Sequence, residues 1–213
     1  CAVFPEAEGL TDGQMQLIAR EMNLSETAFL FPSSEATFRA RYFTPAEEIP
    51  LAGHPTIASV FVMLQEGMIE PPGEGEEREI TMELTAGTVS VRLVARGGRP
   101  WITMRQLPPK FLRRYTASEV APVFGLKPSE IRSDVPVQTV STGTPQLMIP
   151  LVDETALNRA ALHREHYLAL KAKGDFFSSH LFVLYPDRDA PSTRARHLAV
   201  SPDIIEDPFT GSA

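Results

Sequence analysis

The sequence predicts an α/β (α+β) protein made of two similar halves, and two observations support this fold class. First, segments in which apolar and polar residues alternate, as they do in strands, are interspersed with helix-like segments along the whole chain. Second, a strand that starts with Ala-Arg occurs at Ala40 and again at Ala195. Each copy leads through a proline-containing loop to a glycine, Gly53 or Gly211, at the expected opening of a helix.

A change of composition after residues 108–109, a Pro-Pro pair, places the boundary between the two lobes. We expect an N-terminal lobe over residues 1–108 and a C-terminal lobe over residues 109–213. The chain starts at Cys1 without a methionine and stops at Ala213, just after a typical helix opening. We therefore expect that the given sequence is part of a longer chain.

In the N-terminal half, Thr11 and Gln14 have the spacing of a capping box, which predicts a helix running to about residue 22. A second helix is expected to start at Pro55 and run to about residue 65, and its nearly uniform apolar character predicts a central, buried helix. Five strands are expected in this half, the last three as an antiparallel meander: 28–31, 37–43, 79–84, 88–94 and 100–104.

In the C-terminal half, the pattern predicts short helical pieces and one long helix among further strands. The long helix is expected over residues 155–173, because apolar residues there fall roughly on one face. The expected short helical pieces cover 118–124 and 128–131, and the expected strands cover 136–140, 146–151, 180–185 and 194–200.

Charge and cysteine content exclude several classes of function. The 213 residues include 20 Lys and Arg against 27 Asp and Glu, so the net charge of −7 argues against nucleic-acid binding. No apolar stretch approaches the roughly 18 residues of a membrane span, which argues against a membrane protein. Cys1 is the single cysteine, so no internal disulfide forms and no two-thiol mechanism is open to this chain. We expect a cytoplasmic protein.

Several residues are candidates for chemistry. The glycines at the two helix openings offer unpaired N–H groups that bind carboxylates or phosphates, although glycine is also common in ordinary turns. Glu26 stands before an apolar strand, where loss of hydration favours the protonated form that a general acid needs; a solvated carboxylate or a helix cap is the alternative. Asp207 precedes a proline, where it orients a polar group or forms an Asx turn.

Other candidates are weaker. His163 and His166 have the spacing of a metal-binding pair on a helix, but their neighbours are charged and there is no third ligand nearby, so we interpret them as surface residues. Ser25, Ser59 and Ser141 lack the Gly-x-Ser-x-Gly context of a nucleophile. We expect no metal and no cofactor.

Four motifs, taken together and in their order along the chain, are more specific than any one of them alone. They are residues 23–27 (NLSET), residues 43–56 (FTPAEEIPLAGHPT), residues 141–143 (STG) and residues 206–213 (EDPFTGSA). With this set the whole chain resembles the PhzF-like family of phenazine biosynthesis. The resemblance implies a fold like diaminopimelate epimerase, in which two pseudo-symmetric lobes each wrap a curved, mostly antiparallel sheet around a central helix. Compared with a full member of this family, we expect the first lobe to lack its first strand and the second lobe to lack its central helix and its end.

The resemblance also implies an activity: cofactor-independent isomerisation, characterised in the family for a dihydro-hydroxyanthranilate, with the active site between the lobes. Carried over by motif, Glu26 moves the proton, with His54, Asp207 and Ser212 as its catalytic partners. The resemblance and the helix openings place substrate-binding positions at Ser25, Gly53, Thr56, Gly143 and Gly211. The expected partners are a small anionic substrate and a second copy in a homodimer.

Two alternatives stay open at this point. One is a binding protein for small anions that keeps the cleft without catalysis, and the other is an epimerase of the same fold that does not use thiols. A metal hydrolase using His163 and His166 is a remote third possibility. A test of proton exchange that depends on Glu26 separates the first alternative from the isomerase.

Overall fold

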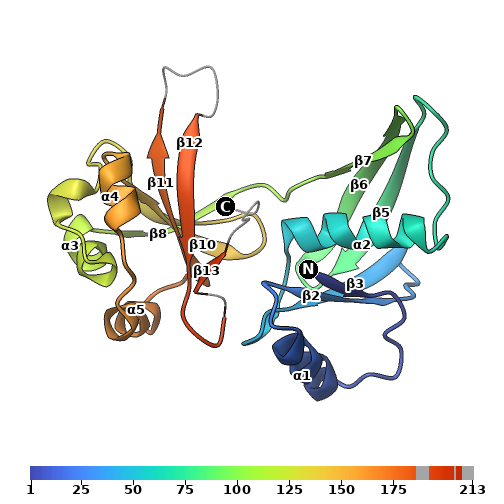
Figure 1. The fold of residues 1–213 in the computed structure, drawn as a ribbon, viewed down its shortest axis with the longest axis horizontal. Coiled ribbons are helices and arrows are strands. Elements are labelled where there is room, and N and C mark those ends of the chain that lie inside the picture. Colours follow the sequence, from blue (N-terminus) through green and yellow to red (C-terminus); the bar gives the residue numbers. More distant parts are fainter. Residues whose placement is uncertain (186–191, 204, 208–213) are drawn as a thin grey trace. The chain divides into compact units, whose positions relative to one another are not determined.

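The structure is a computed structural model that describes residues 1–185, 192–203 and 205–207. The chain forms two compact units, an N-terminal unit of Cys1–Pro108 and a C-terminal unit that starts at Pro109 (Figure 1). Each unit has a mixed α/β architecture with its own sheet and its own core. Within the described residues, no helix combines the length and the apolar character that a membrane crossing needs.

In the N-terminal unit, a seven-stranded sheet has the order β1-β2-β3-β5-β6-β7, with β4 paired to β3. Helix α2 (Gly53–Gln65) contacts β1 and β2 at one end of this order and β7 at the other, so the sheet curls around the helix (Figure 1). The strands are β1 (Ala2–Phe4), β2 (Thr27–Phe31), β3 (Phe38–Phe43), β4 (Glu48–Ile49), β5 (Glu77–Leu84), β6 (Gly87–Arg96) and β7 (Arg99–Met104).

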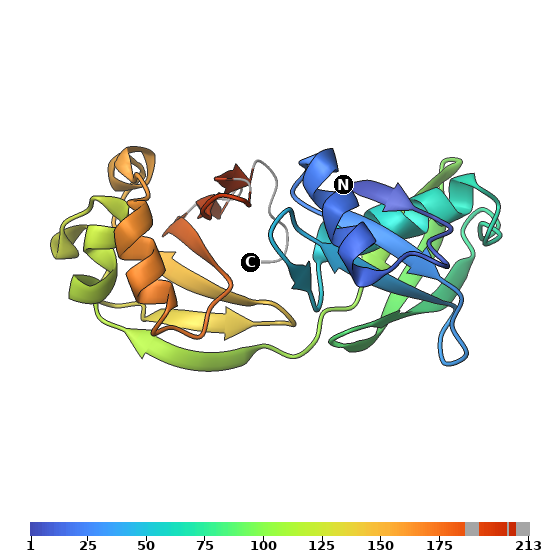
Figure 2. The same ribbon diagram turned by 90° about the horizontal axis from the view of Figure 1, so that it is seen from below.

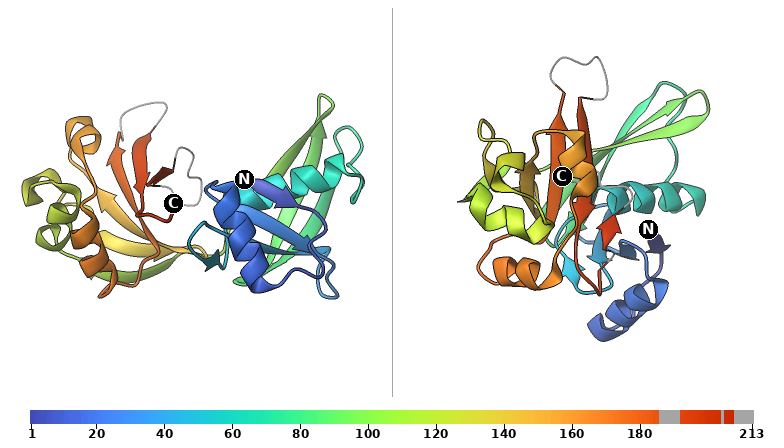
Figure 3. Two further views of the ribbon diagram at one scale, coloured as in Figure 1. Left: turned by 60° about the horizontal axis from the view of Figure 1, so that its bottom comes forward. Right: turned by 60° about the vertical axis from the view of Figure 1, so that its left-hand side comes forward.

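Helix α1 (Asp12–Met22) packs on the other side of β2 and β3 from α2, as the two views of Figure 3 also show. The predicted capping box is present, because the Thr11 hydroxyl accepts from the Gln14 backbone and the Gln14 side chain accepts from the Thr11 backbone. Beneath α1, the ring of Phe29 stacks on Phe4 at 5.1 Å and meets Phe43 edge-on at 5.5 Å. This small aromatic core fixes β2, the strand that follows Glu26.

Helix α2 differs from its prediction in two ways. It begins at Gly53, so Pro55 is the third helical residue rather than the first. It is buried on one face only, with Val60 and Met63 inside, whereas Phe61 is 47% exposed. The apolar residues on every side of this helix predicted complete burial, but one side of the helix is exposed.

In the C-terminal unit, a six-stranded sheet has the order β13-β12-β11-β10-β9-β8, and the helices cover one of its faces (Figures 1 and 2). The strands are β8 (Lys110–Tyr115), β9 (Val137–Ser141), β10 (Pro145–Pro150), β11 (Ser178–Leu184), β12 (Thr193–Leu198) and β13 (Glu206–Asp207). The α-helices are α3 (Ala117–Val120), α4 (Glu154–Arg159) and α5 (Arg164–Lys171), and the 3₁₀ helices are η1 (Ala121–Phe124) and η2 (Pro128–Glu130).

The prediction of one long helix over residues 155–173 is wrong. The chain forms α4 and α5 with a break between them. At the break, the backbone N–H of Ala161 donates to the carbonyl of Phe124, and that of His163 donates to the carbonyl of Val123. Hydrogen bonds to η1 thus replace the helical ones, a tertiary effect that helical periodicity does not reveal.

The repeated Ala-Arg strands have the same local structure in both units. Arg41 in β3 donates from Nε and Nη2 to both carboxylate oxygens of Glu48 in β4, at 2.8 and 2.6 Å. Arg196 in β12 donates in the same way to Glu206 in β13, at 2.8 Å for both bonds. Each bidentate pair holds a short second strand antiparallel to the first.

Candidate active site

Glu26 and His54 meet in the N-terminal unit. Glu26 directly precedes β2, and His54 is the second residue of α2. Nε2 of His54 lies 2.9 Å from Oε2 of Glu26, and the two side chains are 26% and 17% exposed. The atoms are at ion-pair distance, yet Oε2 is buried and accepts no well-directed hydrogen bond from the described residues. The carboxylate of Glu26 and the imidazole of His54 are thus close enough to exchange a proton.

The opening of α2 surrounds this pair with positive backbone character. Ala52 occupies the N-cap position without a side-chain hydrogen bond, so the first N–H groups of the helix have no side-chain cap. Gly53 is buried at the first helical position. The partial positive charge of a helix N-terminus favours a negative group nearby, whether the Glu26 carboxylate or an anionic ligand.

Two further predicted binding residues lie in the same unit. Ser25 is half-buried next to Glu26. Thr56 is completely buried, and its hydroxyl donates to the Ala52 carbonyl at 2.7 Å and lies 2.8 Å from the Tyr42 hydroxyl. The predicted substrate contact of Thr56 stays a prediction, and in this structure its hydroxyl is engaged with protein groups.

The other predicted site residues belong to the C-terminal unit. Asp207 is the last residue of β13 and pairs directly with His197 of β12. Gly143 lies in the turn between β9 and β10, where its N–H donates to Ser141 Oγ at 3.1 Å. Gly211 and Ser212 lie outside the described residues. Of the predicted set, the structure thus brings Glu26 together with His54, and the roles assigned to all of these residues remain predictions.

The structure reveals a histidine pair that the sequence reading does not single out. His180 of β11 and His197 of β12 are register partners, with ring centroids 5.7 Å apart and exposed fractions of 8% and 9%. Burial lowers the pKa of His180 to about 4, with His197 adding to the decrease. Burial also lowers the pKa of His197, while the charge of Asp207 opposes that decrease. Both rings are therefore neutral at pH 7. In the sequence, only the periodicity of the two strands could have indicated that these histidines lie side by side.

His163 and His166 do not form part of a metal centre in the described part of the chain. His163 is the N-cap residue of α5, and Nδ1 of His166 lies 3.2 Å from the carbonyl oxygen of Pro122. Among residues that the structure describes, no group of three or more His, Cys, Asp or Glu side chains could hold a metal ion.

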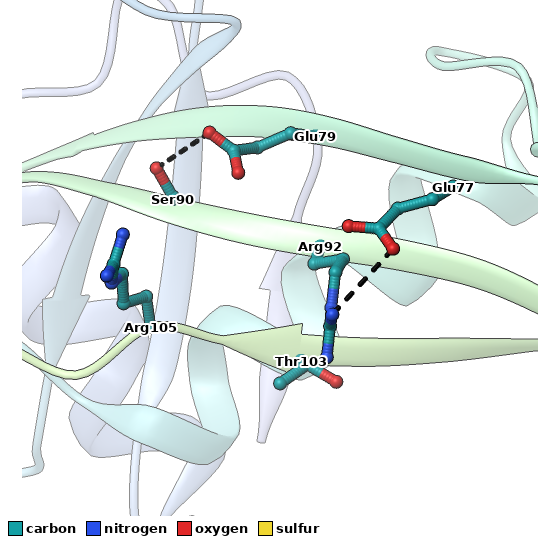
Figure 4. Close-up of a pocket in the computed structure, with 6 residues that line it drawn as sticks. All are labelled: Glu77, Glu79, Ser90, Arg92, Thr103 and Arg105. Atoms are coloured by element: carbon teal, nitrogen blue, oxygen red, sulfur yellow. Dashed lines mark hydrogen bonds and ion pairs between the residues drawn. The ribbon is translucent and has the colours of Figure 1, made fainter.

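A surface pocket of about 320 Å³ lies apart from these residues, on strands β5, β6 and β7 (Figure 4). Its charges are balanced: Arg92 lies 3.7 Å from Glu77, and Ser90 donates to Glu79 at 3.1 Å. Arg105 and Thr103 complete the lining. The charge balance and the absence of Glu26 and His54 from the lining make this pocket a poorer candidate for acid–base chemistry than the opening of α2.

Comparison with known proteins matches the chain to one family. The sequence profile of the phenazine biosynthesis-like proteins, PhzC-PhzF, matches residues 1–213. The chain is 32% identical over 214 residues to a protein of Escherichia coli K12 named uncharacterized isomerase YddE, covering 99% of this chain and 69% of the relative.

Solved structures give the same picture. A PhzF-family phenazine biosynthesis protein of Bacillus anthracis superposes with a TM-score of 0.78 at 28% identity, covering 99% of this chain and 70% of the other. A structure from Pseudomonas aeruginosa, described as a predicted epimerase, superposes with a TM-score of 0.77 at 31% identity, covering 99% and 71%. The fold of two curled sheets is shared with these proteins.

Proposed function

The chain belongs to the family of phenazine biosynthesis-like proteins, and from that premise we propose that it moves a proton on a small carboxylated substrate with Glu26 as general acid and base. Its curated relatives are named isomerases, and the chain is an isomerase of this family. The proposed substrate resembles a cyclic amino or hydroxy acid, and the proposed reaction needs no cofactor.

The contact between Glu26 and His54 is the observation that carries this proposal. A general acid or base works within hydrogen-bond reach of the group with which it exchanges a proton, and the 2.9 Å between Oε2 of Glu26 and Nε2 of His54 is within that reach. Partial burial strengthens electrostatic interactions at this position. In the proposed reaction, the C–H bond breaks as the proton moves to Glu26, and its electron pair forms a new carbon–carbon double bond while an existing double bond of the substrate opens. Glu26 then returns the proton to the far carbon of the opened double bond.

The surrounding groups have supporting roles in this scheme. His54, at 2.9 Å, stabilises the carboxylate when its imidazole is protonated, and its Nε2 exchanges a proton with Glu26. The uncapped N–H groups at the opening of α2 stabilise negative charge on a bound carboxylate or on the carbanion-like transition state. These donors are fixed by the helix, so they do not need to reorganise during the reaction.

Proton exchange in D₂O tests the proposal without knowledge of the product. Cyclic and acyclic amino and hydroxy acids are incubated with the protein, and deuterium incorporation at carbon is measured by NMR. We expect exchange with some members of the panel, and loss of that exchange in Glu26→Gln. Glu79→Gln, on the outer face of the sheet, is the matched control and keeps the activity. Exchange that persists in Glu26→Gln excludes Glu26 as the base.

A binding experiment separates the isomerase from a non-catalytic protein. Thermal unfolding is recorded with the same panel of compounds. Compounds that stabilise the wild-type protein without any deuterium incorporation would support a small-anion binding protein instead of the proposed enzyme.

A further inference from the structure

A buried tyrosine lies directly behind the first turn of α2. Tyr42 of β3 is completely buried, and its hydroxyl oxygen is 2.8 Å from Oγ1 of Thr56. Thr56 has one hydroxyl hydrogen, which it donates to the carbonyl of Ala52 at 2.7 Å. Tyr42 must therefore be the donor in its contact with Thr56, which gives a continuous chain from Tyr42 through Thr56 to Ala52.

The residues joined by these hydrogen bonds lie on both sides of His54. Ala52 is the N-cap residue of α2 and Thr56 is four positions further on, so the hydrogen bonds span the turn that carries His54. At its other end, Tyr42 is the register partner of Ala28 in β2, the strand that begins directly after Glu26. Tyr42 thus connects the strand pair next to Glu26 to the helical turn that presents His54.

The turn depends on such a contact more than most helix openings do. No side chain caps it at Ala52, and its first residue is Gly53, which has the least intrinsic preference for a helix apart from proline. Burial raises the pKa of Tyr42 above its ordinary value, so its hydroxyl stays a neutral donor throughout the working pH range. The link therefore holds at every pH at which the enzyme would work.

The C-terminal unit shows that the strand pair itself does not require a tyrosine here. The bidentate Arg41–Glu48 pair has its counterpart in Arg196–Glu206. By register, the position of Tyr42 in the first pair corresponds to His197 in the second. The same strand arrangement thus forms with a histidine at the position of the tyrosine. The local fold therefore does not require the hydroxyl of Tyr42.

We infer that Tyr42 is a positioning residue: through Thr56, its hydroxyl fixes the first turn of α2 and thereby holds His54 against Glu26. The inference rests on the proposed function, because its catalytic consequence requires that Glu26 and His54 act together. Acid–base partners must be held closely, and a displacement of about 1 Å costs on the order of 100-fold in rate. Loss of the Tyr42 hydroxyl is therefore expected to affect turnover more than binding.

Tyr42→Phe tests the inference, with Tyr167→Phe as its matched control. Tyr167 is also buried and donates its hydroxyl to a backbone carbonyl, that of Phe177 at 3.4 Å, but it lies in the C-terminal unit. We expect Tyr42→Phe to lower kcat for deuterium exchange about 10- to 100-fold, with a smaller change in KM. Tyr167→Phe should leave both constants unchanged although it also loses a buried hydrogen bond.

A double-mutant cycle with Thr56→Val tests the proposed route. If Tyr42 acts through Thr56, Tyr42→Phe adds little to the loss in kcat that Thr56→Val causes alone. Fully additive losses contradict the route.

The ¹⁵N NMR signals of the His54 imidazole give a readout that needs no substrate. Tyr42→Phe is expected to shift these signals, whereas Tyr167→Phe leaves them unchanged. If both variants only lower the unfolding temperature, with kcat and the His54 signals unaffected, Tyr42 is a structural residue and the inference is wrong. If the wild-type protein exchanges no proton on any substrate, the proposed function fails, while the His54 signals still decide whether Tyr42 positions this ring.

Discussion

Oε2 of Glu26 and Nε2 of His54 lie 2.9 Å apart, although one residue precedes a strand and the other opens a helix. The strand β2 is fixed between α1 and α2, and the opening of α2 is fixed to β3 through Thr56 and Tyr42. Two elements distant in sequence thereby bring a carboxylate and an imidazole together. The following predictions test what this contact does and what holds it.

Glu26→Gln is expected to lower the rate of carbon deuteration by about 10²- to 10⁴-fold, the range that a positioned acid/base contributes. Glutamine keeps the size of the side chain and one acceptor oxygen, so the far-UV circular dichroism and the unfolding temperature should stay close to those of the wild type. If Glu26→Gln unfolds at a lower temperature than the wild type, Glu26→Asp serves as a second test, because aspartate keeps the carboxylate and shortens its reach.

His54→Gln is expected to cause a smaller loss of kcat, about 10- to 100-fold, at the lower end of acid–base contributions. KM should change less than kcat, because the proposed role of the imidazole is in proton transfer. His166→Gln, on α5 of the other unit, is the control and should change neither property. An unaltered kcat in His54→Gln contradicts a role for this imidazole in proton transfer.

The histidine pair in the C-terminal unit makes stability depend on pH. The folded-state pKa of His180 is lowered from 6.5 to about 4, and that of His197 is lowered as well, chiefly by burial. Below pH 6.5 the unfolded chain therefore binds more protons than the folded chain, so this contribution to stability is complete above pH 6.5 and is lost as the pH falls toward 4.

Urea unfolding at several pH values measures this effect. Met148 is the register partner of His180, and Asp207 is that of His197. Asp207 is charged and opposes the lowering of the His197 pKa, so it reduces the loss of stability at low pH. We expect His180→Asn to flatten the decrease in unfolding free energy between pH 6.5 and 4 by up to roughly 3 kcal/mol. An equally steep decrease in His180→Asn would show that this histidine is not buried in its neutral form.

The bidentate pair of Arg41 and Glu48 is expected to contribute measurably to stability. The Arg41 side chain is 16% exposed, donates two hydrogen bonds to Glu48, and donates a third to Asp12 at 2.7 Å. Arg41→Ala should lower the unfolding free energy by about 1–3 kcal/mol.

Arg92→Ala provides the comparison in the same sheet. Arg92 and Glu77 are both more than half exposed and 3.7 Å apart, so this variant should cost at most about 0.5 kcal/mol. Equal losses in the two variants would mean that the geometry of the Arg41 pair brings no extra stability.

Local signals in the sequence were enough for much of the fold. The capping box of Thr11 and Gln14 predicted α1, and period-two alternation predicted β3, because both patterns depend on neighbours within a few residues. The short strands β1 and β4 were not predicted, since two or three residues carry too little periodicity. Helices α4 and α5 were merged into one, because the break between them depends on carbonyls of η1.

The sequence by itself determined the candidate chemistry: four ordered motifs identified the family and named Glu26 and His54. Only the tertiary structure decided which groups meet. The 2.9 Å contact of Glu26 with His54, the Tyr42–Thr56 hydrogen bond behind it, and the facing rings of His180 and His197 all join separate elements. The physical reason is that such contacts follow from strand register and helix docking, which depend on packing across the whole unit and not on local sequence.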